Sequence, residues 1–215
     1  MTKEYFFRNT AHSEALKLNE SFDFKCRDCG NCCKGNTNHT LTGYDVYRIA
    51  KHFDTSTKEV IEKYCHWDTS NQNSLLPVLF MNYGENGYCQ LYGDGKCTVH
   101  SSKPVFCAIL PLNMRLNYEE GIISYTIMDR TEMPPKCKYE SEYQVVNDWL
   151  ADFQISENDP NIISWYNTLI KIINTPLTAN MQDALKGALY TNFDIKKVFS
   201  EQLVANLNGV LFEKL

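Results

Sequence analysis

The sequence predicts an α+β protein in which a small, metal-knit domain with short helices and a small antiparallel sheet precedes a helical C-terminal half. Four of the nine cysteines fall between residues 26 and 33, and most of the others lie in turns rich in Gly or Pro. After residue 137 the chain contains no Cys and no His, and its apolar residues recur at helical spacing. We therefore expect a cysteine-cluster metal-binding domain at residues 20–140 and a helical region at 141–215 packed on it.

The composition is that of an ordinary globular protein, with 215 residues, 43% hydrophobic and 22% charged. No apolar run is long enough to span a bilayer, and the first residues lack the apolar core of a signal peptide. We therefore expect a cytoplasmic protein that does not enter a membrane. The net charge of −5 and the lack of a Lys/Arg block argue against a nucleic acid as partner. A protein partner is possible, but the sequence does not identify one.

The cysteine run reads CRDCGNCC from Cys26 to Cys33. Thiols two residues apart, with glycine between them, let a tight turn present several sulfurs to one ion or cluster. Without a signal peptide, nine cysteines favour reduced, metal-binding thiols over disulfides. Because Cys32 and Cys33 are adjacent, we expect their side chains to diverge. One of the two would then serve a second site or pack.

Two short helices are predicted after this run. The residues TGYD at 42–45 place an acid at the third helical position of a helix that ends near Phe53. The residues STKE at 56–59 repeat this start for a helix that runs to about Cys65. At that position we expect Cys65 to be a buried small apolar side chain rather than a ligand.

Two hairpins are predicted in the middle of the chain. The runs at 75–81 and 88–92 flank a glycine-containing turn, and the runs at 112–118 and 122–128 flank Glu-Glu-Gly. Their β-branched and aromatic residues suit strands, so together they predict a small antiparallel sheet.

Helices are predicted for the rest of the chain. The first starts at Ser141, and the second starts at Asp159-Pro160, where proline suits the first helical position. A third covers roughly 181–190, and a fourth, capped by Asp194, runs to about Leu211.

Several separate cysteine segments follow one another along the chain. They are CxxCGxCC at 26–33, GYCQL at 87–91, CTVH at 97–100, KPVFC at 103–107 with Pro111, and Cys137. Together these segments resemble the YkgJ-type cysteine-cluster (CxxCxxCC) family, which is described as zinc- or iron-chelating. The resemblance implies metal binding without a defined biochemical role. Where the family commonly has Arg-Pro and Cys-Arg, this chain has Lys103-Pro104 and Cys107-Ala108, which keep the thiol and lose the arginine.

The thiols on turns are expected to converge on one region, with Cys65 outside it. Zinc ions would be bound by these thiols in two tetrahedral sites. A [4Fe-4S] cluster would use three from CxxCxxC and one remote cysteine, and the spacing does not decide between Zn2+ and the cluster. His100, three residues after Cys97, has the context of a ligand, but a lone histidine is more often packed. The predicted ligands are Cys26, Cys29, Cys32, Cys33, Cys89, Cys97, Cys107 and Cys137.

The sequence does not decide whether the protein is an enzyme. It contains no GxSxG, HExxH, GxxxxGK[ST] or strand-linked GxGxxG motif. Flagellin lysine N-methylases carry a similar cysteine-rich region, so a protein-modifying enzyme related to them is the alternative, although this chain is shorter and lacks a recognisable cofactor loop. Lys25, Arg27 and Lys34 flank the cysteine run, and we expect them to offset thiolate charge rather than to activate a nucleophile.

Overall fold

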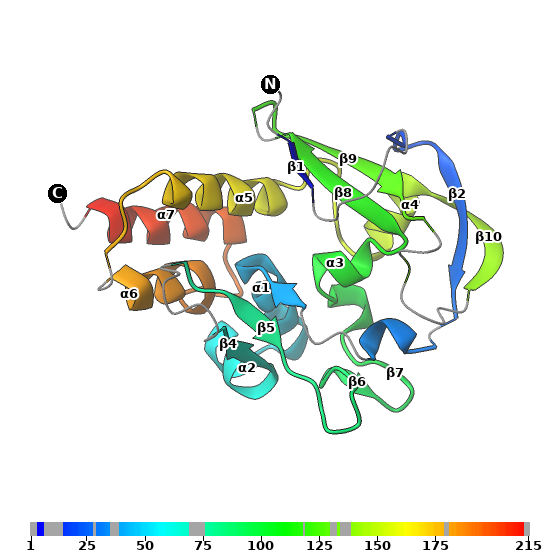
Figure 1. Ribbon diagram of the computed structural model, residues 1–215, viewed down its shortest axis with the longest axis horizontal. Helices are drawn as coiled ribbons and strands as arrows, with labels where there is room; N and C mark the ends of the chain where they lie inside the picture. The colour runs from blue at the N-terminus through cyan, green and yellow to red at the C-terminus, as the bar shows by residue number, and fades with distance from the viewer. Residues whose placement is uncertain are drawn as a thin grey trace. The chain divides into compact units, whose positions relative to one another are not determined.

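The computed structural model describes residues 4–6, 15–27, 29–34, 39–68, 76–117, 119–129, 133, 139–178 and 181–212. Helices and small antiparallel sheets alternate along the chain, which confirms the α+β class (Figure 1). The chain forms two compact units, each made of two separate segments. Unit 1 consists of residues 1–35 and 91–159, and unit 2 consists of residues 36–90 and 160–215. The three boundaries therefore lie at 35/36, 90/91 and 159/160, whereas the sequence suggests one division at residue 140.

Unit 1 contains three small antiparallel sheets, with strand orders β1-β8-β9, β10-β2 and β6-β7. The predicted hairpin at 112–128 is confirmed, because β8 pairs with β9 from Leu112 opposite Ile127 to Asn117 opposite Ile122. The strands are β1 (Glu4–Phe6), β2 (Ser21–Cys26), β6 (Tyr92–Gly93), β7 (Lys96–Cys97), β8 (Leu112–Asn117), β9 (Ile122–Ile127) and β10 (Tyr139–Val145).

The helix predicted from Ser141 starts later than expected. Residues 139–145 form β10, and the helix α4 (Val146–Asp152) begins only after it. Strand β10 pairs with β2, in which Phe22 and Phe24 are buried alternately with exposed residues. Both phenylalanine rings pack edge-on against Trp149 of α4, at centroid distances of 5.8 and 5.7 Å. Pairing with a distant strand therefore overrides the local helical pattern.

Unit 2 begins with the two helices that the sequence predicts, α1 (Gly43–Phe53) and α2 (Thr57–Tyr64). Both start with a complete capping box, in which the hydroxyl of the N-cap residue and the carboxylate three residues later each accept a backbone N–H. For α1 these residues are Thr42 and Asp45, with distances of 3.0 and 2.8 Å. The sequence predicted these starts because the signal is local.

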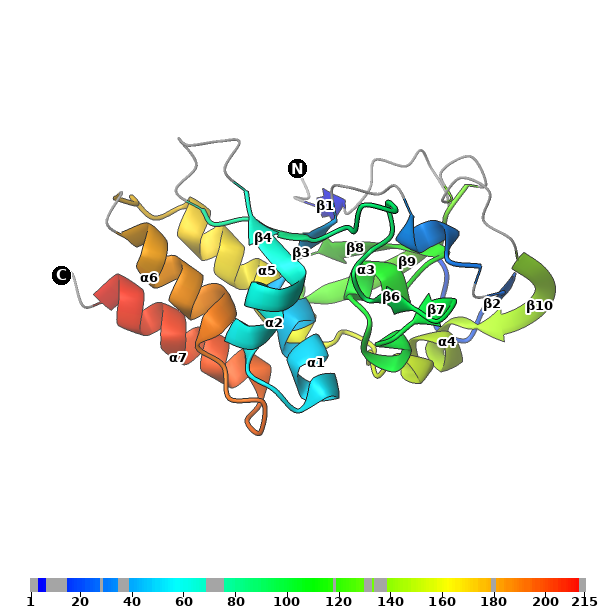
Figure 2. The ribbon, with the colours of Figure 1, turned by 90° about the horizontal axis from the view of Figure 1, so that it is seen from below.

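Helices from both segments of unit 2 pack together. Helix α5 (Pro160–Ile173) lies alongside α7 (Phe199–Phe212) and also contacts α1 (Figures 1 and 2). The third predicted helix is divided into α6 (Gln182–Lys186) and a π-helical turn, η4 (Gly187–Thr191). The C-terminal helices therefore share a core with α1 and α2, which the sequence had grouped with the cysteines.

The hairpin predicted at 75–92 is reduced to one bridge. Strand β5 (Leu79–Met81) lies between β3 (Thr40–Leu41) and β4 (Cys65–Trp67), and Leu75 lies outside the described residues. Only Tyr83 and Cys89 form the expected cross-strand pair, across a turn at Gly87 with a φ of +75°. Hydrogen bonds from Gly84 to Tyr88 and from Gln90 to Asn82 flank this bridge, so residues 88–90 pair across the turn. They do not pair with β5, whose edges are taken by β3 and β4.

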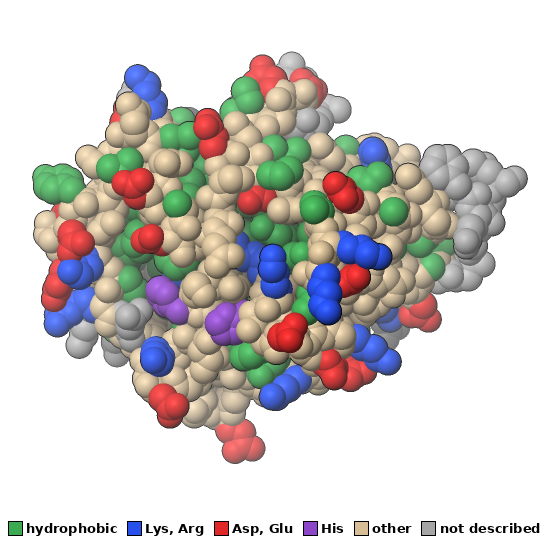
Figure 3. All heavy atoms as spheres, turned by 180° about the vertical axis from the view of Figure 1, so that it is seen from behind, with side chains coloured by type: hydrophobic (Ala, Val, Ile, Leu, Met, Phe, Trp, Pro, Cys, Tyr) green, Lys and Arg blue, Asp and Glu red, His purple; other side chains and the backbone are tan. Residues whose placement is uncertain are grey.

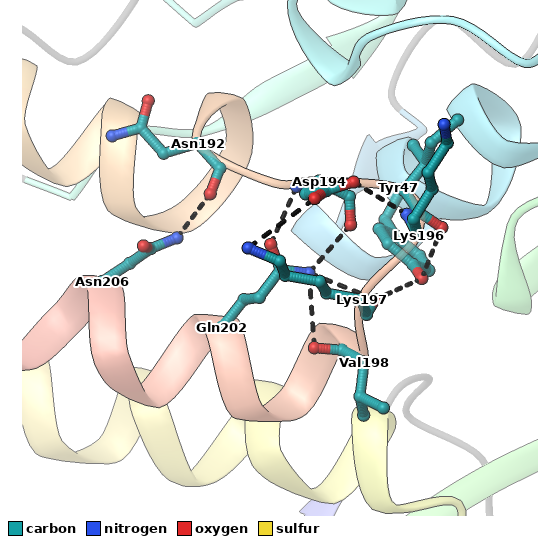
Figure 4. Close-up of polar contacts among 9 residues, drawn as sticks. Tyr47, Asn192, Asp194, Lys196, Lys197, Val198, Gln202 and Asn206 are labelled. Carbon is teal, nitrogen blue, oxygen red and sulfur yellow. Dashed lines mark hydrogen bonds and ion pairs between the residues drawn. The ribbon is translucent and has the colours of Figure 1, made fainter.

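Asp194 does not start a helix, since α7 begins at Phe199. Instead, the Gln202 side chain reaches back from α7 to the loop, where its Oε1 accepts the Asp194 N–H at 2.8 Å and its Nε2 donates to the Asp194 carbonyl at 3.0 Å. Tyr47 of α1 donates its hydroxyl to the Lys197 carbonyl at 2.7 Å (Figure 4). These side chains hold residues 194–198 in a loop between η4 and α7.

Replacing Tyr47 by phenylalanine is expected to lower the free energy of unfolding by about 1 kcal/mol, because the Lys197 carbonyl loses its buried donor. Urea denaturation measures this change. Tyr143→Phe serves as the control, because Tyr143 is 81% exposed. Equal effects of the two substitutions would contradict the role assigned to the Tyr47 hydroxyl.

The described surface carries apolar as well as charged side chains. Large exposed apolar side chains such as Tyr143 and Ile173 occur. On the face shown in Figure 3, apolar, acidic and basic side chains are interspersed. Among the described helices, none is both long and apolar enough to cross a membrane.

Candidate metal centre

The cysteine run turns sharply where glycine allows it. Cys26 ends β2, Gly30 has a left-handed φ of +68°, and residues Asn31–Cys33 form the 3-10 turn η1. The Cys33 N–H donates to the Gly30 carbonyl at 2.9 Å. A glycine at this position therefore lets the chain reverse with thiols on both sides of the turn.

Tyr92 of β6 packs directly on Gly30. A Cβ atom at Gly30 would lie 2.4 Å from the Tyr92 hydroxyl oxygen, so the ring covers the turn without leaving room for a side chain. Tyr92 pairs with Cys97 across the β6-β7 hairpin. This ring therefore fixes the cysteine run against the strand that carries Cys97. No pattern in the sequence indicates this contact.

Gly30→Ala is expected to lower the free energy of unfolding by about 3 kcal/mol, because it adds a collision with Tyr92 to an unfavourable φ. Gly95→Ala separates the two causes, since Gly95 has a φ of +79° and nothing within 4 Å of its Cβ position. We expect the control to cost only about 1 kcal/mol. Chemical denaturation of both variants checks this difference, and equal costs would mean that Tyr92 does not matter.

Cys32 and Cys33 lie together rather than apart. Their Sγ atoms are 3.9 Å from each other, which shows that the expected divergence of adjacent side chains is wrong. The tight η1 turn and rotation about the Cα–Cβ bonds allow both sulfurs to point the same way. Adjacent cysteines can therefore bind a common ion.

Two further thiols act on Cys33. Its pKa is raised first by the contact with Cys32, then by burial, and then by the charges of Cys32, Cys107 and Cys97. Cys97 ends β7, and Cys107 lies in the short helix α3 (Val105–Ala108). The charges of Cys97 and Cys107, on two other segments of unit 1, thus act on Cys33, and repulsion among ionised thiols disfavours thiolates unless a cation is present.

The remaining cysteines are divided between the two units of the chain. Cys26 and Cys29 are half-buried on the same run, Cys89 belongs to unit 2, and Cys137 lies outside the described residues. Cys65 is 7% exposed, so its predicted burial is confirmed. No disulfide joins any two of the eight cysteines within the described ranges. Within the same ranges, no three Cys, His, Asp or Glu side chains are already arranged to hold a metal ion.

A family model matches residues 25–138, which is just over half of the chain and includes the whole cysteine run. It describes the CxxCxxCC family as a "putative zinc- or iron-chelating domain". The chain belongs to this family. A search of the curated proteins and a search of the solved structures gave no match. No match supports the alternative of a lysine methylase.

The CxxCxxCC domain uses the Lys103 segment for packing. The Lys103 ammonium lies 4.2 Å from the centre of the Phe153 ring, and the His100 ring lies 5.6 Å from the same ring. These contacts hold the turn η2 (His100–Ser102) near Phe153, at the end of α4. Lysine at the position of the family's usual arginine therefore anchors the segment between Cys97 and Cys107.

Two of the basic residues close to the thiols of the CxxCxxCC domain, Lys25 just before Cys26 and Arg27 just after it, are paired with carboxylates. Lys25 forms an ion pair with Glu142, and Arg27 forms one with Glu140 at 3.2 Å. Both carboxylates lie on β10, which pairs with β2, so each cation forms its ion pair with a residue of the neighbouring strand. These ion pairs follow from the β2–β10 pairing, which the sequence did not predict.

Proposed function

We propose that this protein binds zinc through the thiolates of Cys32, Cys33, Cys97 and Cys107. The observation that carries the proposal is the 3.9 Å separation of the Cys32 and Cys33 sulfurs. Two sulfurs that each lie about 2.3 Å from a tetrahedral zinc ion are about 3.8 Å apart. In a [4Fe-4S] cluster, each thiolate binds a different iron atom, so ligand sulfurs are separated by the width of the cluster.

The donor set also suits zinc. Thiolates are soft ligands that favour Zn2+ and iron over hard cations such as Mg2+ and Ca2+. The Cys33 pKa is raised by the contact with Cys32, by burial and by the charges of neighbouring thiols, and a dication would offset that charge repulsion. Metal binding then draws the segments that carry Cys33, Cys97 and Cys107 into one closed site, and zinc in such a site stabilises the fold.

The other predicted ligands that belong to unit 1 stay candidates for a second zinc site. They are Cys26, Cys29 and Cys137. The metal centre would serve either to stabilise the fold or to handle metal ions. Cytoplasmic location and a protein partner remain expectations from the sequence.

Anaerobic purification followed by metal analysis tests the proposal. We expect a colourless protein with at least one equivalent of zinc per chain. A brown protein that contains iron and acid-labile sulfide would contradict zinc and favour the cluster. A colourless protein without bound metal, even after incubation with zinc, would contradict metal binding itself.

Zinc affinity is expected to fall as the pH falls. The pKa of Cys33 is raised above its usual value of 9.0, so the metal-free thiol is protonated at neutral pH. Zinc binds thiolates, so binding must release protons, and acid must reverse it. Titration with zinc in weakly buffered solution should therefore acidify the medium, and competition with a chelator should show weaker binding at pH 6 than at pH 8. An affinity independent of pH would contradict thiolate ligation.

A further inference from the structure

Cys65 and Cys89 are both paired with one continuous segment of unit 2, residues 79–83, Cys65 in the β4–β5 ladder and Cys89 in an isolated bridge. Cys65 of β4 stands opposite Met81 of β5, and Cys89 stands opposite Tyr83. Met81 and Tyr83 are two residues apart on one extended segment, so their side chains point to the same face. The side chains opposite them, those of Cys65 and Cys89, share that face as well.

The two cysteines also lie along the same edge of that segment. The Asn82 N–H donates to the Tyr64 carbonyl at 2.8 Å, and the Asn82 carbonyl accepts the Gln90 N–H at 3.1 Å. In a strand, the N–H and C=O of one residue point to the same side. The chain before Cys65 and the chain after Cys89 therefore meet at Asn82, whose side chain also donates to the Cys65 carbonyl.

This register places the two Cα atoms about two strand residues apart, or about 6.8 Å. Disulfide-bonded cysteines have Cα separations of about 4.4–6.8 Å, so a bond is within reach. Burial first and the charge of Cys89 second raise the pKa of Cys65 to about 12, and the effect of Cys89 agrees with this proximity. The Cys65 thiol lies against the Val60 carbonyl at 3.9 Å, while Cys89 is partly exposed.

We propose that Cys65 and Cys89 form a redox-active dithiol that a small-molecule disulfide, such as glutathione disulfide, converts into an intramolecular disulfide. The more accessible Cys89 sulfur attacks the oxidant, the S–S bond breaks, and one glutathione leaves as a thiol with the proton from Cys89. The Cys65 sulfur then attacks the Cys89 sulfur, and the second glutathione leaves with the proton from Cys65. Two cysteine thiols lose two electrons, and one disulfide becomes two thiols. This site shares no residue with the zinc site of Cys32, Cys33, Cys97 and Cys107.

The sequence provides a direct test of this dithiol. Trypsin cuts after Lys63 and Lys96, and the peptide at 64–96 contains Cys65 and Cys89 and no other cysteine. The full-length protein is incubated with glutathione disulfide, quenched with acid, alkylated in denaturant and digested. We expect this peptide to be two hydrogens lighter than its reduced form, with neither an alkyl group nor glutathione. Reduction before alkylation should restore two alkyl groups.

Cleavage after Glu85 gives a second readout, since the two fragments should remain linked through Cys65 and Cys89. In Cys65→Ser, the reaction should stop with glutathione on Cys89. The proposal is overturned if the wild-type peptide stays fully alkylated, if it carries glutathione on Cys89 beside an alkylated Cys65, or if either cysteine is joined to a cysteine outside 64–96.

Discussion

Cys33→Ser is expected to release the metal and to destabilise unit 1 more than any other single change considered. Cys33 contacts Cys32 and is affected by Cys97 and Cys107, so its loss removes the thiol at the centre of the proposed site. Structural zinc can contribute on the order of 10 kcal/mol, while a domain has about 5–15 kcal/mol of net stability. Zinc analysis of the purified variant and its thermal unfolding measure both effects.

Cys65→Ala is the matched control for Cys33→Ser. Cys65 is also buried, but it belongs to unit 2 and lies outside the proposed zinc ligands. Its replacement should cost about 1–2 kcal/mol of packing and leave the zinc content unchanged. If both variants retained the same amount of zinc, the ligand role of Cys33 would be wrong.

Gly43→Ala is expected to lower the free energy of unfolding by about 4 kcal/mol. Gly43 opens α1, and a Cβ atom there would lie 1.9 Å from the Leu189 carbonyl oxygen and 2.8 Å from the Trp165 ring. Backbone cannot move aside as a flexible side chain can, so α1 must separate from η4 or α5. Chemical denaturation monitored by circular dichroism measures the loss.

Gly209→Ala makes the same chemical change but is expected to raise the free energy of unfolding rather than to lower it. Gly209 lies inside α7 and has nothing within 4 Å of its Cβ position. Alanine there should stabilise the helix by up to about 1 kcal/mol. A cost at Gly209 as large as that at Gly43 would show that the tight contact with Leu189 is not the cause.

The sequence predicted elements whose signals are local. The capping boxes that begin α1 and α2, and the proline that begins α5, act within a few residues, so their positions were correct. Strand β2 was missed and β10 was mistaken for helix, because each depends on a partner more than a hundred residues away. Pairing of this kind leaves little trace in either segment alone.

The sequence likewise predicted only those parts of the candidate site whose signals are local. Spacing alone indicated that the run from Cys26 to Cys33 has metal-site chemistry, and the family match agrees. The approach of Cys32 to Cys33 depends on side-chain rotation in η1, and the packing of Tyr92 on Gly30 depends on the β6-β7 hairpin. Neither follows from residue spacing. Placement of Cys89 beside Cys65 rather than within unit 1 likewise depends on the ladder of unit 2.

The interleaved construction of the two units affects how the chain can fold during synthesis. The segment at 36–90 divides unit 1, and the segment at 91–159 divides unit 2, so each unit must wait for its second half to leave the ribosome. Thiols of the cysteine run emerge well before Cys107 and long before α5 and α7 can cover α1. Nascent chains would therefore expose several unligated cysteines and an uncovered apolar helix, a state that favours capture by a chaperone and makes early metal supply valuable.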